Sequence, residues 1–70
     1  MPKSISFILN GELYYIKKAI TISDLLIYFN CNNFLCVLEY NGLIYSNKKW
    51  GRIFIENNSK IEIVTIVGGG

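Results

Sequence analysis

The chain has 70 residues, of which 51% are hydrophobic and 17% are charged. This length allows one small domain of marginal stability, and the apolar content predicts that it folds without a metal or disulfides. No apolar run approaches the roughly 18 residues of a membrane span. The absence of histidine excludes Ser-His-Asp and Cys-His catalysis. Two cysteines do not make a metal site, and a net charge of +2 is too small to indicate nucleic-acid binding.

The first predicted elements are two strands joined by a tight turn. Residues 4–9 alternate between two faces, which is the period of a half-buried strand, and Ile8 falls on the outer side. Asn10-Gly11 favours a type I′ hairpin because both central positions of that turn need positive φ. Residues 13–17 are the expected returning strand.

A short helix is predicted next. Thr21 and Asp24 have the spacing of a capping box, in which each residue satisfies a backbone N–H of the other. The apolar residues that follow lie three or four apart and share one helical face: Ile22, Leu25, Leu26 and Phe29. Asn30 suits the left-handed conformation that ends a helix. About two turns are not stable alone, so this helix must pack on a sheet.

The second half of the chain contains three further strands. Residues 35–40 and 43–45 form a hairpin around Asn41-Gly42, and residues 46–55 read as an irregular crossover with a helical turn. After a polar turn, residues 60–67 form the last strand.

This order predicts an α+β fold: a mixed four- to five-stranded sheet with one main helix packed on one face. The first and last strands lie side by side and parallel at the centre, which is the β-grasp or ubiquitin-like arrangement. Residues 1–67 make up this domain, and residues 68–70 form a flexible glycine tail.

One helix covers only one face of such a sheet, so apolar residues on the other face stand out. They are Ile8, Val37, Val64 and Ile66, which fall on the outer rows of three predicted strands. An exposed apolar patch of this kind marks a partner surface, unless a loop or a second subunit covers it.

Three glycines, Gly68, Gly69 and Gly70, directly follow the last predicted strand. One interpretation is a frayed terminus without a role. The other is a reactive tail that reaches about 10 Å and threads a narrow channel. Because glycine puts no Cβ beside the last carbonyl carbon, attack on that carbon is unhindered.

The chain resembles the ThiS family, the small sulfur carriers of thiamine biosynthesis, along nearly its whole length. The resembling stretches are Asn10-Gly11-Glu12, TISDLL at 21–26, VLEYNG at 37–42, Trp50 and IEIVTIVGGG at 61–70. The specific feature is a strand that runs straight into terminal glycines. Residues 56–59 depart from the Asp-Gly turn frequent in the family, but asparagine tolerates the same positive φ.

The resemblance implies a protein that is not an enzyme and binds no cofactor of its own. A ubiquitin-activating-like adenylyltransferase uses ATP to adenylate the Gly70 carboxylate. A sulfur donor such as a cysteine desulfurase then produces a thiocarboxylate, and thiazole synthase takes the sulfur. The location expected for the chain, independently of the resemblance, is the cytosol or the plastid stroma. Gly68 and Gly69 thread the partner, while Val64, Ile66 and Val67 lie where contacts near the tail are expected.

Two alternatives share the predicted fold. A sulfur carrier for molybdopterin has the same tail and differs in the enzyme that receives the sulfur. A ubiquitin-like modifier or a plain interaction domain joins Gly70 to a lysine amine or leaves it unused.

Overall fold

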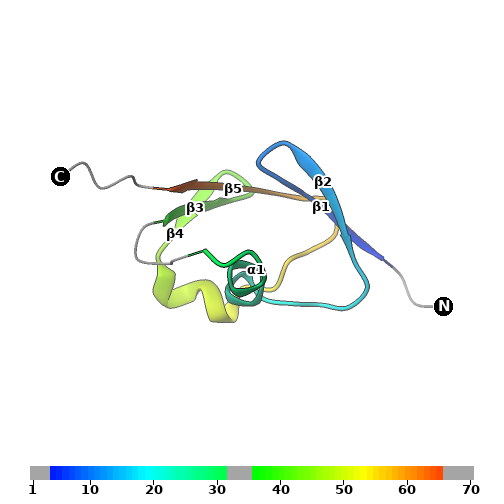
Figure 1. Cartoon of the computed structure of the whole chain (residues 1–70), viewed down its shortest axis with the longest axis horizontal. Coiled ribbons are helices and arrows are strands. Elements are labelled where there is room, and N and C mark those ends of the chain that lie inside the picture. Colours follow the sequence, from blue (N-terminus) through cyan, green and yellow to red (C-terminus); the bar gives the residue numbers. More distant parts are fainter. Residues whose placement is uncertain (1–3, 32–35, 66–70) are drawn as a thin grey trace.

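The computed structural model describes residues 4–31 and 36–65. Five strands form one mixed sheet in the order β2-β1-β5-β3-β4, and helix α1 lies across one face (Figure 1). The elements are β1 (Ile5–Leu9), β2 (Glu12–Ile16), α1 (Ile22–Tyr28), β3 (Cys36–Tyr40), β4 (Leu43–Tyr45), the 3-10 helix η2 (Asn47–Arg52) and β5 (Ser59–Thr65). β1 and β5 run parallel at the centre, so the predicted β-grasp fold is confirmed.

The two hairpins form at the predicted turns. Asn10 and Gly11 have φ of 49° and 84°, and Asn41 and Gly42 have φ of 51° and 87°. Both pairs therefore adopt the double positive φ that matches the twist of the flanking strands.

Helix α1 has seven residues and begins at the predicted cap. The Thr21 hydroxyl accepts a hydrogen bond from the Asp24 N–H, and the Asp24 carboxylate accepts one from the Thr21 N–H, both at 3.1 Å. Ile22, Leu25 and Leu26 are buried. Phe29, expected on the same face, is the C-cap residue; its ring meets Tyr14 of β2 edge to face, and 37% of its surface stays exposed.

The core lies between α1 and the sheet. Its buried members are Phe7, Leu9, Ile22, Leu25, Leu26, Leu38, Tyr40, Trp50, Ile55 and Ile61. The crossover was predicted to be irregular with a helical turn, and it contains the 3-10 helix η2, which buries Trp50. The Trp50 indole N–H donates to the Tyr45 carbonyl at 3.0 Å. The crossover thus closes one side of the core.

Strand β5 spans Ser59–Thr65, whereas residues 60–67 were predicted. The predicted positions 66 and 67 lie outside the described residues. Along the row that faces α1, Ile61 is buried, Ile63 is half-buried and Thr65 is exposed. Cover from the helix therefore decreases toward the end of the strand.

Candidate functional site

The candidate site is the end of β5 and the sheet around it. β5 is hydrogen-bonded to β1 on one side and to β3 on the other, and its last residue, Thr65, pairs with Cys36. The predicted residues Ile66, Val67, Gly68, Gly69 and Gly70 lie outside the described residues. The part of the site that the structure describes is therefore the platform that leads to them.

The turn between β1 and β2 is hydrogen-bonded to β5 near the C-terminal end of that strand. The pairing of β1 with β5 stops at Leu9 and Ile61. The Asn10 N–H then donates to the Ile61 carbonyl at 2.9 Å. The Asn10 side chain accepts from the Ile63 N–H at 2.7 Å and donates to the Ile63 carbonyl at 3.2 Å. A side-chain amide thus takes the place of one more residue of the neighbouring strand.

Two residues of the predicted apolar patch lie side by side on the sheet face away from α1. Val37 on β3 is directly opposite Val64 on β5, and Val64 is 61% exposed. Beside them, Glu39 and Glu62 are also directly opposite each other. Two carboxylates in this position repel each other and attract a cationic group.

The structure does not bring Ile8 to this pair. Ile8 is paired with Lys60 on β5, four residues before Val64, which corresponds to roughly 13 Å along the strand. On its other side, Ile8 is paired with the exposed Leu13 of β2. The predicted patch therefore divides into two, with the charged residues of β5 between them.

A hollow of about 280 Å³ lies beside the end of β5, lined by Asn10, Ile63, Thr65, Cys31 and Tyr14 among others. Desolvation raises the pKa of the Cys36 thiol, and the neighbouring Cys31 adds to the shift. Desolvation, with the Glu12 carboxylate nearby, raises the pKa of the Tyr14 hydroxyl. Both groups stay protonated near neutral pH, so neither is poised as a base or nucleophile.

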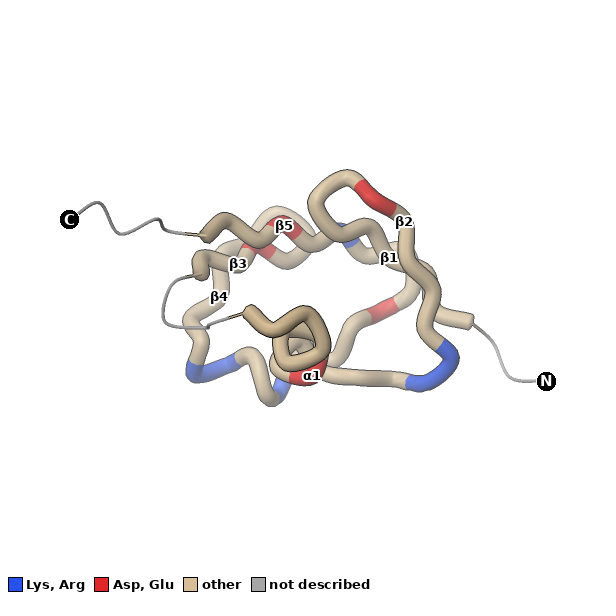
Figure 2. Tube along the Cα trace, in the orientation of Figure 1, with Lys and Arg blue, Asp and Glu red and all other residues tan. Residues whose placement is uncertain are grey.

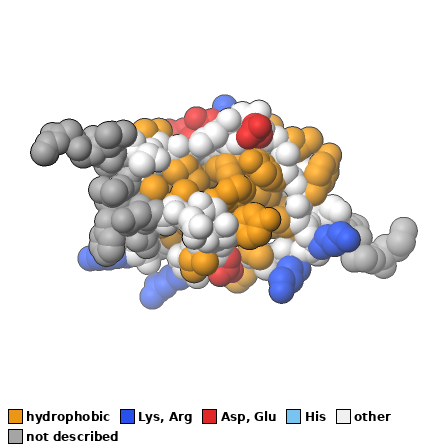
Figure 3. Space-filling view, viewed as in Figure 1, with side chains coloured by type: hydrophobic (Ala, Val, Ile, Leu, Met, Phe, Trp, Pro, Cys, Tyr) orange, Lys and Arg blue, Asp and Glu red, His pale blue; other side chains and the backbone are white. Residues whose placement is uncertain are grey.

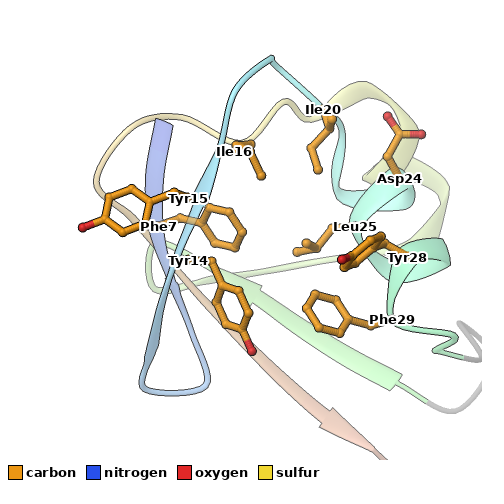
Figure 4. Close-up of a pocket in the computed structure, with 9 residues that line it drawn as sticks. All are labelled: Phe7, Tyr14, Tyr15, Ile16, Ile20, Asp24, Leu25, Tyr28 and Phe29. Atoms are coloured by element: carbon orange, nitrogen blue, oxygen red, sulfur yellow. The ribbon is translucent and has the colours of Figure 1, made fainter. Parts of the chain in front are cut away.

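A larger cavity of about 490 Å³ opens between the β1–β2 hairpin and α1. Apolar side chains gather around it on the surface (Figure 3), and aromatic rings from both elements point toward it (Figure 4). The Tyr14 ring stacks on Phe7 and meets Phe29 edge to face. This cavity was not predicted, because the sequence did not sort the two faces of the returning strand.

Within residues 4–31 and 36–65, no cluster of three or more acidic or cysteine side chains could hold a metal ion. Among the described helices, none combines the length and apolar character that crossing a membrane requires.

Comparison with known proteins identifies relatives along most of the chain. The sequence model of the ThiS family matches residues 7–70. The uncharacterized protein ycf40 of Trieres chinensis is 55% identical over 65 residues, which cover 93% of this chain and 89% of that protein. The uncharacterized protein ycf40 of Porphyra purpurea is 32% identical over 68 residues, covering 97% of this chain and 96% of the relative.

The fold also matches a solved structure. The crystal structure of the thiamine biosynthesis protein ThiS from Geobacter metallireducens superposes with a TM-score of 0.80. It covers 94% of this chain and 100% of that chain, at 16% sequence identity. At this identity the likeness concerns the fold, and it agrees with the mixed sheet and single helix described above.

Proposed function

The chain belongs to the ThiS family of small sulfur carriers, and we propose that it supplies sulfur for the thiazole ring of thiamine. The observation that carries this proposal is the family match over residues 7–70, which includes the terminal glycines. In this proposal the chain is a substrate of partner enzymes, in the cytosol or plastid stroma, and ATP is used by a partner.

The proposed chemistry takes place at the carboxylate of Gly70. A carboxylate is a poor electrophile, so an adenylyltransferase of the ubiquitin-activating type first joins it to AMP and releases pyrophosphate. The outer sulfur of a persulfide, the form in which a cysteine desulfurase supplies it, attacks the carbonyl carbon, and AMP leaves. A thiol then cleaves the S–S bond of this acyl disulfide, becomes oxidised to a disulfide with the donor cysteine, and releases the thiocarboxylate. The resulting thiocarboxylate is a nucleophile near neutral pH without help from histidine, and thiazole synthase receives its sulfur.

The architecture supports a carrier whose body aims its terminus. β5 is the central strand, bonded on both edges, and the chain continues from it directly into residues 66–70. Fixing the strand before a short segment limits the volume that the terminus explores, which favours its capture in a partner's channel. Gly68 and Gly69 are the proposed threading residues.

We assign the first partner contacts to the outer sheet face near the end of β5. Val37 and Val64 provide an apolar pair, and Glu39 and Glu62 provide two adjacent carboxylates. A complementary adenylyltransferase surface is apolar with a basic residue at its rim. Ile66 and Val67 extend this proposed contact toward the tail, whereas Ile8 belongs to a separate contact at the start of β5.

Intact-mass analysis tests the proposal. The full chain is incubated with ATP, the adenylyltransferase and a sulfide source, and the product is fragmented to locate the change. We expect one oxygen atom to be exchanged for sulfur at Gly70. Transfer of that sulfur to thiazole synthase supports the thiamine role; transfer only to the large subunit of molybdopterin synthase contradicts it.

The control has to separate sulfur loading from oxidation, because adding one oxygen atom changes the mass by nearly the same amount. A variant that lacks Gly70 keeps Met1, Cys31 and Cys36, so it oxidises as the parent chain does. It should gain no sulfur. An equal, ATP-dependent mass change in this variant, or a change located away from Gly70, would refute the proposal.

A further inference from the structure

Strand β5 continues beyond its partner on one side. β1 pairs with β5 only as far as Leu9 and Ile61, whereas β5 runs on to Thr65. On the other edge, pairing with β3 continues to Cys36 and Thr65. The last four residues of β5 therefore pair with a strand on one edge only. On the other edge, backbone hydrogen bonds have to come from the β1–β2 turn.

The turn supplies the Asn10 side chain. Its amide oxygen accepts from the Ile63 N–H at 2.7 Å, and its amide nitrogen donates to the Ile63 carbonyl at 3.2 Å. The Asn10 N–H also donates to the Ile61 carbonyl. Three hydrogen bonds from one turn residue thus extend the parallel pairing to a point two residues before Thr65.

A second asparagine makes a similar contact near the other end of the same strand. Asn41, in the β3–β4 turn, donates from its N–H to the Lys60 carbonyl and accepts from the Lys60 N–H, both at 2.8 Å. Asn10 and Asn41 have nearly the same φ, 49° and 51°, and each precedes a glycine. The two residues are chemically matched, but only Asn10 acts close to the end that leads to the glycines.

We propose that Asn10 is a positioning residue for the C-terminal tail, holding the end of β5 so that Gly70 meets the adenylylating site in a productive orientation. The inference rests on the proposed function. Residues 66–70 can reach at most about 17 Å from Thr65, so the position of Thr65 sets the volume in which Gly70 is found. Loosening the strand end enlarges that volume and lowers the fraction of encounters in which the reacting group is correctly placed, which costs rate more than binding.

Two substitutions separate the side-chain amide from the turn. Asn10→Gly keeps a residue that adopts positive φ and removes all side-chain bonds to Ile63. Asn10→Asp retains an oxygen that accepts from the Ile63 N–H. Asn41→Gly is the matched control, because it removes the same group from the equivalent turn and affects Lys60 instead.

The first measurement is amide hydrogen exchange by NMR in the full chain. In Asn10→Gly the Ile63 amide should exchange about tenfold faster, because its acceptor is lost. The amide of Val64, which alternates to the β3 side where Val64 pairs with Val37, should follow as the strand end loosens. Asn10→Asp should keep most of the Ile63 protection, and Asn41→Gly should leave both amides unchanged. Equal exchange at Ile63 and Val64 in Asn10→Gly and the parent chain would overturn the proposal.

The second measurement is the steady-state rate of adenylation with purified adenylyltransferase and ATP. Asn10→Gly should lower kcat roughly tenfold and leave KM within about twofold, and Asn10→Asp should recover most of the loss. A merely structural role predicts equal effects from Asn10→Gly and Asn41→Gly, and that result would overturn the proposal. If the parent chain is not adenylated at all, the proposed function fails, while the exchange rates still decide whether Asn10 holds the strand end.

Discussion

At the scale of single residues, asparagine has a recurrent role in this small fold. Every non-glycine residue with positive φ in the described ranges is an asparagine: Asn10, Asn30, Asn41 and Asn58. Asparagine tolerates the left-handed conformation and offers an amide that bonds to nearby backbone. In the turn before β5, the side-chain amide of Asn57 also bonds to backbone. Its oxygen accepts from the Ser6 N–H at 2.8 Å and so ties this turn to β1.

Ser59 is the residue for which we predict a gain in stability. Its side chain is 2% exposed, and its hydroxyl has no hydrogen-bond partner within the described part of the chain. Because a buried hydroxyl without a partner is destabilising, Ser59→Ala should raise the free energy of unfolding by about 1 kcal/mol. Urea denaturation measures this change.

The control for Ser59→Ala is Ser6→Ala. The Ser6 hydroxyl donates to the Asn57 side chain at 3.2 Å, so its removal should not stabilise the protein. A decrease in stability for Ser59→Ala as large as that for Ser6→Ala would show that the Ser59 hydroxyl has a partner.

At the scale of secondary structure, local signals placed most elements correctly. The turns at Asn10-Gly11 and Asn41-Gly42 and the cap at Thr21 depend on neighbouring residues, so they could be read from the sequence. The alternation of β5 also correctly separated buried Ile61 from exposed Val64.

Features that depend on strand register could not be predicted. The expected grouping of Ile8 with Val64 failed because β1 pairs with the start of β5. Asn10 was interpreted only as a turn residue, since its side-chain partner Ile63 is 53 positions away. The burial of Trp50 likewise depends on where the crossover passes over the core. Periodicity gives the face of a strand but not its neighbours.

The outer sheet face yields the prediction at this scale. Val64→Lys removes apolar surface and places a positive charge where we propose a basic partner residue. We expect the affinity for the adenylyltransferase, measured by isothermal titration calorimetry, to fall at least about tenfold. Because the Val64 side chain is 61% exposed, the free energy of unfolding should change by only about 0.5 kcal/mol.

Ile27→Lys is the matched control for Val64→Lys. Ile27 is 73% exposed and lies on α1, on the opposite side of the sheet. This variant should bind the adenylyltransferase as the parent chain does. If both variants bind equally well, the outer sheet face is not the contact surface.

At the scale of the whole molecule, the two sides of the sheet differ in charge. Five of the seven basic residues lie in the bend after β2 and in the 3-10 helix, around α1, which itself carries Asp24: Lys17, Lys18, Lys48, Lys49 and Arg52. The outer sheet face carries Glu39 and Glu62 together with Lys60, so it is the less basic side (Figure 2). Such an asymmetry orients the molecule as it approaches a charged partner. The sheet side, which includes the end of β5, is the side we expect to meet a basic surface.

The central claim is that the main-chain carboxylate of Gly70 carries the sulfur and that the folded body only holds and aims it. The most direct test compares the native chain with a semisynthetic chain whose terminal carboxylate is an amide, under identical conditions with adenylyltransferase, ATP and isotopically labelled sulfide. We predict label on the native chain and none on the amide, with identical thermal unfolding of both, because the amide cannot be adenylated. Label transferred equally by the amide would contradict the account.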